Sequence, residues 1–121
     1  MKNILVVDDE ADILETIVDS LEIEFEDLIT VHTAGNGNEA LVLFNEETHY
    51  SLVITDLNMP DMNGLELTEN IKKIKNETPI IVFTGHGDVE EKEALHSLGV
   101  AAMIKKPYVE DLIEAVAKVI N

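Results

Sequence analysis

The sequence has no cysteine among its 121 residues. This absence excludes a disulfide framework, a thiol nucleophile and a cysteine-based zinc site. Aromatic residues are also scarce, at 4% of the chain, so we expect an aliphatic core. No stretch approaches the roughly 20 apolar residues that a membrane-spanning helix requires. The N-terminal "MKNILVVDDE" breaks a short apolar run with three acids, which does not fit a signal peptide. These absences predict a cytoplasmic chain without membrane insertion.

Basic residues are few as well. Eight Lys and Arg stand against twenty-five Asp and Glu, which gives a net charge of -17. A surface so negative repels nucleic acid and anionic lipid, so direct nucleic-acid binding is not expected. Apolar residues make up 45% and charged residues 27% of the chain, as in an ordinary globular protein. The length suits one domain, over residues 1–121.

Short apolar runs rich in Val and Ile alternate with segments of helical period. Several of the runs lack polar alternation, which is typical of strands buried on both faces. The runs cover residues 3–8, 28–33, 52–56, 79–84 and 101–106. Helical segments lie between and after them, two of them over 36–44 and 88–98, the latter with Asp88 as N-cap and Gly99 just past the end. Five such alternations predict an α/β fold, with a parallel sheet covered by helices on both faces.

Charged and polar side chains gather where the predicted strands end. In an open parallel sheet, the functional crevice lies outside those carboxyl ends. The acids there would repel one another unless a cation neutralised them, and an all-oxygen set favours Mg²⁺, with Mn²⁺ as the alternative. A hydroxyl and an ammonium would complete a phosphoryl-binding pocket, in which a carboxylate could act as nucleophile. The residues concerned are Asp8, Asp9, Glu10, Asp56, Thr84, Lys105 and Lys106.

These residues lie in motifs that resemble the receiver domain of two-component response regulators, and the resemblance covers the whole chain. The matching motifs are "LVVDDE", "AGNGNEAL", "LVITDLNMPDMNG", "PIIVFTGHG" and "LGVAAMIKKPY". The resemblance implies a flavodoxin-like (βα)5 fold with strand order 2-1-3-4-5. It also implies Mg²⁺ dependence and phosphoryl transfer to one aspartate from a sensor histidine kinase or a histidine phosphotransfer protein.

The resemblance assigns roles to the acidic residues and to the loop after the third strand. Asp56 would be the phosphoacceptor. Asp9 would ligate Mg²⁺ directly, Asp8 would assist through water, and the backbone carbonyl of Asn58 would be a further ligand. Pro60 and Gly64 are expected to be turn residues of the loop.

The resemblance also assigns the residues that would sense the phosphoryl group. Thr84 would be the switch hydroxyl, and Gly85 is the small residue expected after it. Lys106 would contact the phosphoryl group because it directly precedes Pro107, and the bond between them is expected to be cis. Lys105 should then point to the opposite side of the strand.

One position departs from the pattern of the family, and two others could modulate the site. Receivers often carry Tyr or Phe three residues before the lysine, whereas this chain has Met103, which can repack but offers no hydroxyl. Met103 is therefore the candidate relay, in place of an aromatic side chain. Asn58 and His86 flank the pocket and could influence the lifetime of a phosphoryl group.

Other readings compete with the receiver. An aspartyl-phosphate phosphatase would share the intermediate but would need an acid two residues after the nucleophile, where this chain has Asn58. The "GNGNEA" segment imitates a dinucleotide-binding fingerprint but lies after the second strand and not the first. A binding module that has lost its switch would not need the complete set of aspartates, threonine and lysine.

The predicted function is a phosphorylation-dependent signalling switch and not an enzyme, apart from its own phosphorylation and dephosphorylation. Its downstream protein target would bind the face formed by the fourth helix, the fifth strand and the fifth helix. The sequence leaves two forms open, a stand-alone regulator and a receiver cut from a larger regulator or hybrid kinase.

Overall fold

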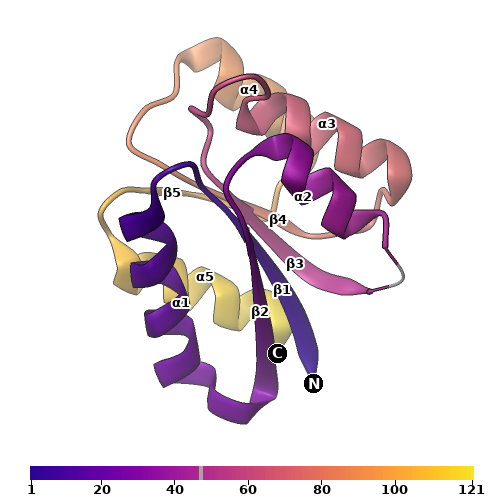
Figure 1. Cartoon of the computed structure of the whole chain (residues 1–121). Helices are drawn as coiled ribbons and strands as arrows, with labels where there is room; N and C mark the ends of the chain where they lie inside the picture. Colours follow the sequence, from indigo (N-terminus) through magenta and orange to yellow (C-terminus); the bar gives the residue numbers. More distant parts are fainter. Residues whose placement is uncertain (47) are drawn as a thin grey trace.

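The structure is a computed structural model that describes residues 1–46 and 48–121. In this part of the chain, five strands and five α-helices alternate (Figure 1). The strands are β1 (Lys2–Val7), β2 (Ile29–Ala34), β3 (Tyr50–Thr55), β4 (Ile80–Thr84) and β5 (Ala102–Lys105). The helices are α1 (Ala11–Phe25), α2 (Gly37–Phe44), α3 (Gly64–Ile74), α4 (Val89–Ser97) and α5 (Val109–Ile120), with a short 3-10 turn η1 (Glu26–Leu28) after α1.

The strands form one parallel sheet in the order β2-β1-β3-β4-β5. This order and the parallel pairing confirm the flavodoxin-like fold predicted from the sequence. None of the described helices is both long and apolar enough to cross a bilayer.

Helices cover both faces of the sheet because successive strand residues point to opposite sides. In β1, Ile4 and Val6 pack in one apolar cluster, and Leu5 and Val7 pack in the other. The first cluster joins α1 and α5, and the second joins α2, α3 and α4. Figure 1 shows the same division, with α1 and α5 together on one side of the sheet. The central strands are therefore buried on both faces, as their uniform apolar runs predict.

Polar side chains fix where the helices begin. Asn36 caps α2 by accepting a hydrogen bond from the backbone N–H of Glu39. Asn63 and Asp88 do the same for α3 and α4, and each forms a capping box with a glutamate three residues later. Past α4, Gly99 adopts a φ of 77°, a conformation that favours glycine. The predicted starts of α2 and α4 are thus confirmed.

The strand ends differ slightly from the predicted ones. β1 and β3 end at Val7 and Thr55, one residue before Asp8 and Asp56. The sheet pattern nevertheless continues through backbone hydrogen bonds: the N–H of Asp8 donates to Ala34 (3.2 Å) and that of Asp56 donates to Val7 (3.0 Å). Lys106 is held in the same way, by its N–H donating to the carbonyl of Thr84 (2.9 Å). All three residues therefore start from a fixed backbone at the same edge of the sheet.

Candidate functional site

Four acidic residues meet at the carboxyl edge of the sheet. Asp8, Asp9, Glu10 and Asp56 each offer a carboxylate oxygen, and these oxygens all lie within 4.8 Å of one another. Asp8 and Asp56 are buried, whereas Asp9 and Glu10 are exposed. The cluster thus has a buried floor and a rim open to solvent.

Lys106 bridges the two buried carboxylates. Its Nζ donates to Oδ2 of Asp8 at 2.8 Å and to Oδ2 of Asp56 at 3.1 Å. The carboxylate of Glu10 lies further away, at 4.0 Å. In the described part of the chain, every salt bridge is made by Lys106. One ammonium therefore compensates three acids, which leaves the cluster with excess negative charge.

Burial changes the proton affinity of this cluster. Burial raises the pKa of Asp8 above its ordinary value, and the hydrogen bonds from Lys106 and from the N–H of Glu10 only partly reverse this. For Lys106, burial lowers the pKa, but the bonds and charges of Asp8 and Asp56 outweigh it, so the pKa is raised overall. The buried carboxyl thus resists ionisation while the ammonium stays charged, which is what a site lacking positive charge should show.

The loop after β3 holds Asp56 in one orientation. Its Oδ1 accepts a hydrogen bond from the N–H of Leu57 at 2.7 Å, while its Oδ2 faces Lys106. The hydroxyl of Thr55 donates to the backbone carbonyl of Asp56 at 2.8 Å. The carboxylate is therefore fixed from both sides before any ligand binds.

Gly64 allows this loop to close against the strand end. Its N–H donates to the carbonyl of Leu57 at 2.8 Å. A Cβ at this position would collide with the backbone oxygen of Asp56 and would lie 2.8 Å from the Cα of Leu57. Gly64 is thus required by close approach, and the positive φ in this loop belongs to Asp61, at 67°.

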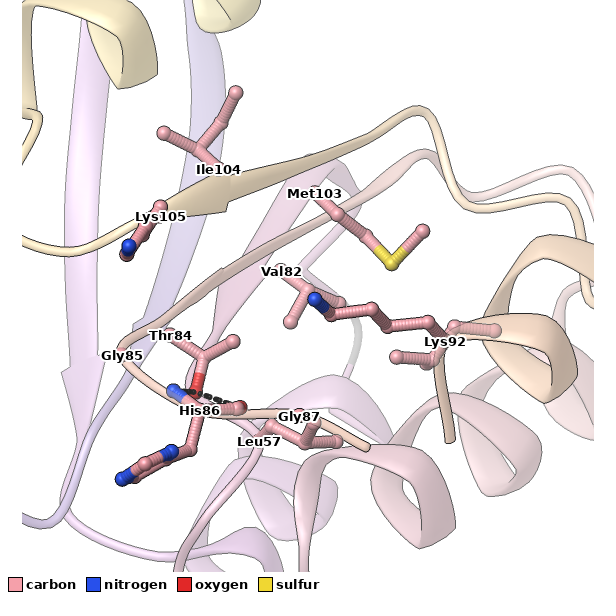
Figure 2. A pocket seen from close by; sticks show the side chains of 11 residues that line it. Leu57, Val82, Thr84, Gly85, His86, Gly87, Lys92, Met103, Ile104 and Lys105 are labelled. Carbon is pink, nitrogen blue, oxygen red and sulfur yellow. Dashed lines mark hydrogen bonds between the residues drawn. The ribbon is translucent and has the colours of Figure 1, made fainter. Parts of the chain in front are cut away.

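Thr84 stands at the end of β4, next to a pocket of about 460 Å³ that we call the Thr84 pocket. Its hydroxyl donates to the backbone carbonyl of His86 at 2.8 Å (Figure 2). In the described residues it makes no hydrogen bond with Asp56. The lining residues are Leu57, Val82, Thr84, Gly85, His86, Gly87, Lys92, Leu95, Met103, Ile104 and Lys105.

Met103 and Lys105 of β5 also line this pocket. Met103 has 39% of its surface exposed, and Figure 2 shows its side chain and that of Lys92 extending toward the same opening. Lys105 lines the Thr84 pocket, whereas Lys106 contacts the acids. The Lys106–Pro107 peptide bond is cis, as the resemblance implies.

The remaining predicted residues surround the cluster. Asn58 is exposed, and its N–H lies 3.4 Å from Oδ1 of Asp56. His86 is exposed in the loop between β4 and α4. Two contributors were not assigned from the sequence: the N–H of Glu10, which donates to Oδ1 of Asp8 at 2.9 Å, and Gly64 as a close-contact glycine. The glycine was visible in the sequence, but its contact with Asp56 depends on tertiary packing.

The donor set suits a hard divalent cation. Carboxylate oxygens are the ligands that Mg²⁺ prefers, and few protein carboxylates are needed because the ion keeps several waters. The described cluster offers no nitrogen or sulfur ligand from histidine or cysteine. The excess negative charge around Lys106 would be neutralised by such an ion, so the residues present fit it.

Comparison with known proteins adds independent evidence. Residues 4–118 match the family model of the response regulator receiver domain. Among curated proteins, the transcriptional regulatory protein CpxR homolog of Haemophilus influenzae is 36% identical over 108 residues, which are 89% of this chain and 45% of that protein. The chain therefore spans about half the length of such relatives.

Solved structures agree with the family match. A response regulator receiver domain protein from Clostridium thermocellum is 36% identical with a TM-score of 0.89, covering 100% of this chain and 95% of that one. The response regulator protein TrrA from Thermotoga maritima, in complex with Mg²⁺ and BeF, is 37% identical with a TM-score of 0.85, covering 98% and 99%.

Proposed function

The chain belongs to the response regulator receiver domain family, and on that premise we propose that Asp56 accepts a phosphoryl group in a two-component phosphorelay. The single observation that carries this proposal is the bridging of Asp8 and Asp56 by Lys106 within a cluster of four acids. The donor would be a phosphohistidine of a sensor histidine kinase or of a histidine phosphotransfer protein. One carboxylate oxygen of Asp56 attacks phosphorus, the P–O bond forms, and the P–N bond to the donor imidazole breaks.

Lys106 prepares this step electrostatically. Its ammonium lies beside the attacking carboxylate and can turn toward the oxygens of the incoming phosphoryl group, whose charge it offsets. The backbone bonds to Asp56 keep the nucleophile in place and so reduce the cost of orienting it.

Mg²⁺ would be held by Asp8, Asp9, Asp56 and the backbone carbonyl of Asn58, with Mn²⁺ as a substitute. When bound, it supplies positive charge that screens the acidic cluster and the phosphoryl oxygens. The exposed side chain of Asp9 is accessible to an ion from solvent, whereas the carboxylate of Asp8 already accepts a hydrogen bond from Lys106.

Thr84 would transmit the phosphorylation of Asp56 to the rest of the fold. Its hydroxyl must give up its bond to the carbonyl of His86 before it can donate to a phosphoryl oxygen on Asp56. That rotation would move the loop after β4 and change the Thr84 pocket, which Met103 also lines. In this way the phosphoryl group would alter target binding on the face formed by α4, β5 and α5. Asn58 and His86 would then set how long the phosphoryl group lasts.

The protein would act as a switch that catalyses only its own phosphorylation and dephosphorylation. Its targets would be proteins, because the charge of -17 opposes direct binding to nucleic acid. A cytoplasmic location stays a prediction.

A phosphoryl mimic tests the switch without a kinase. Beryllofluoride and Mg²⁺ are added to ¹⁵N-labelled protein, and amide shifts are followed by NMR. We expect saturable changes at Asp56, Thr84, Lys106 and Met103 that require both additives and are absent from Asp56→Ala. Changes confined to the metal-binding residues would contradict a Thr84 relay. No change with both additives would contradict the phosphoryl site itself.

A further inference from the structure

The Thr84 pocket has a buried apolar floor. Leu57, Val82 and Leu95 line it, and all three side chains are buried. Its volume of about 460 Å³ lies within the range of roughly 300–1,000 Å³ that is usual for pockets holding small organic molecules. The pocket is therefore large enough for a ligand of that kind, and its floor would remove an apolar group of the ligand from water.

The lining of the pocket differs in charge from the rest of the molecule. Asp and Glu account for twenty-five of the 121 residues, and Lys and Arg for only eight. Yet no acid is among the described residues that line the pocket, whereas Lys92 and Lys105 are. In the described part of the chain, neither lysine makes a salt bridge. The pocket thus offers two ammonium groups that no described carboxylate neutralises.

Lys92 brings its charge close to the apolar floor. Figure 2 shows its side chain extending from α4 toward β4, beside Met103. A Cβ added at Gly87 would lie 3.0 Å from Cδ2 of Leu57 and 3.4 Å from Cε of Lys92. The end of the Lys92 stem and the floor residue Leu57 therefore flank the same small gap. One ligand could meet an apolar surface and a positive charge there at the same time.

Charge complementarity favours an anion with an apolar body. The apolar part would cover the floor, and a carboxylate would accept charge-assisted hydrogen bonds from the two lysines. The net charge of -17 repels anions from the molecule as a whole. An anion would therefore bind only where local positive charge outweighs that repulsion, which makes a preference for the anionic form of a ligand diagnostic of this pocket.

The surroundings of the pocket favour a small molecule over an acidic protein. Glu90 and Glu93 are exposed on α4, the helix that carries Lys92. A stable protein complex covers about 800 Å² of each partner, so an acidic protein surface would also meet these glutamates. A small anion can reach the lysines without covering the rest of the helix.

We propose that the Thr84 pocket binds a small organic anion with an apolar body, of the class of aromatic carboxylates. The ring of the ligand lies on the apolar floor, and its carboxylate pairs with Lys92 and Lys105. No residue proposed to hold Mg²⁺ or to accept the phosphoryl group is among the described lining residues. Ligand binding therefore goes beyond the proposed phosphoryl transfer and does not depend on it.

A matched pair of small molecules tests the pocket directly. The probes are indole-3-acetate and its neutral amide, indole-3-acetamide, which share the same rings and nearly the same shape. Each is titrated into the ¹⁵N-labelled whole chain, and amide shifts report both affinity and location. We expect the carboxylate to bind with a dissociation constant below about 5 mM, at least about fivefold more tightly than the amide. The shifts should centre on Leu57, Thr84, Lys92 and Met103.

Two pairs of lysine substitutions test the charge of the pocket. K92M/K105M should remove the preference for the carboxylate, so that the ratio of the two affinities falls to about one or below. K73M/K118M removes the same charge at two exposed lysines that do not line the pocket, and it should leave the ratio within about twofold of the parent value. Because both variants have the same net charge, only local pairing separates them.

A glycine substitution tests the space of the pocket. Gly87→Ala adds a methyl group between Leu57 and Lys92, so it should weaken the carboxylate and the amide alike, by at least about threefold. Gly35→Ala is the control, since no described atom lies closer than 3.8 Å to the added methyl group. Loss of affinity for both ligands in Gly87→Ala alone would support binding within the pocket.

Three results would overturn the proposal. They are equal affinity of the parent chain for the carboxylate and the amide, equal effects of the two lysine pairs, and NMR shifts that map to another face. Binding of an acidic aromatic peptide but not of indole-3-acetate would assign the pocket to a protein partner and would overturn it too. Asp56→Asn should bind the carboxylate like the parent chain, so this test and the test of phosphorylation can fail separately.

Discussion

Lys106 Nζ lies 3.1 Å from Oδ2 of Asp56, although the two residues are 50 positions apart in the chain. The contact is possible because each residue directly follows its strand and is bound to a neighbouring strand by its backbone N–H. The same ammonium lies 2.8 Å from Asp8. In the absence of a divalent ion, Lys106 is therefore the positive charge on which the buried acids depend.

Removing this charge should destabilise the metal-free protein. Lys106→Met leaves Asp8 and Asp56 without their shared donor, and unpaired buried acceptors of this kind cost about 1–3 kcal/mol. We expect the free energy of unfolding, measured by urea denaturation in EDTA, to fall by about that amount. Lys105→Met is the control, since Lys105 is exposed and surface changes are usually within about 0.5 kcal/mol. Equal effects of the two substitutions would contradict the account.

Mg²⁺ should stabilise the folded protein by binding the acidic cluster. At an ion concentration of 100 times the dissociation constant, the gain is about 2.7 kcal/mol. Asp9→Asn should remove most of the gain, while Asp12→Asn, another exposed acid just inside α1, should retain it. Thermal unfolding with and without Mg²⁺ measures the stabilisation in each of the two variants. A gain that survives in Asp9→Asn would remove Asp9 from the proposed ligands.

The stabilisation of the folded protein by Mg²⁺ should also depend on pH. Burial raises the pKa of Asp8, so in the metal-free fold Asp8 binds a proton more readily than in the unfolded chain. Its contribution to stability is therefore present at low pH and lost as pH rises through the folded pKa. Mg²⁺ binds the ionised form, so its stabilising effect should grow over that same rise. A stabilisation by Mg²⁺ that is greater at pH 4 than at pH 7 would contradict this reasoning.

Gly64→Ala should disturb the nucleophile through the backbone. The new methyl group would meet the carbonyl of Asp56 and the Cα of Leu57, and overpacking of this kind costs about 1–3 kcal/mol. Gly35→Ala is a matched control, because the nearest atom to its Cβ would be a side-chain oxygen 3.8 Å away. Urea denaturation should show the loss for Gly64→Ala only, together with slower phosphorylation. Two variants of equal stability would show that the loop can shift without cost.

Tyr50 should make the fold sensitive to alkali. Burial raises the pKa of Tyr50, so the neutral phenol is favoured in the folded state, and stability should fall as pH rises above about 10. Lys106 adds to the same trend, since its raised pKa gives stability that is lost as pH rises through the folded value. Tyr50→Phe should reduce the slope of unfolding free energy against pH and leave the part due to Lys106.

Tyr50→Phe should also lower the free energy of unfolding at neutral pH. Tyr50→Phe removes the hydroxyl that lies 2.7 Å from Nδ1 of His32, a bond worth about 1 kcal/mol. The comparison therefore uses the slope above about pH 10 and not the absolute stability. An unchanged slope would mean that Tyr50 is not the group that titrates.

The sequence was sufficient to predict the fold and the set of residues at the strand ends. Apolar runs such as that of β3 and the helical repeats of α1 and α5 report burial directly, because a side chain's environment is decided mainly by hydrophobicity. The resemblance to receiver domains then implied the strand order, which the structure confirms.

Other features could not be predicted because they depend on tertiary distances. The single lysine shared by Asp8 and Asp56, the bond from Thr84 to His86 and the clash that excludes a side chain at Gly64 each join residues through packing.

Covalent phosphorylation of Asp56 tests the central claim most directly. The protein is incubated with acetyl phosphate and Mg²⁺, and intact mass spectrometry and peptide mapping locate any added phosphoryl group. The account predicts one group per chain, on Asp56, that requires Mg²⁺ and is absent from Asp56→Asn, while Asp61→Asn, in the same loop, is still modified. A phosphoryl group that persists in Asp56→Asn, or that forms equally well in EDTA, would contradict it.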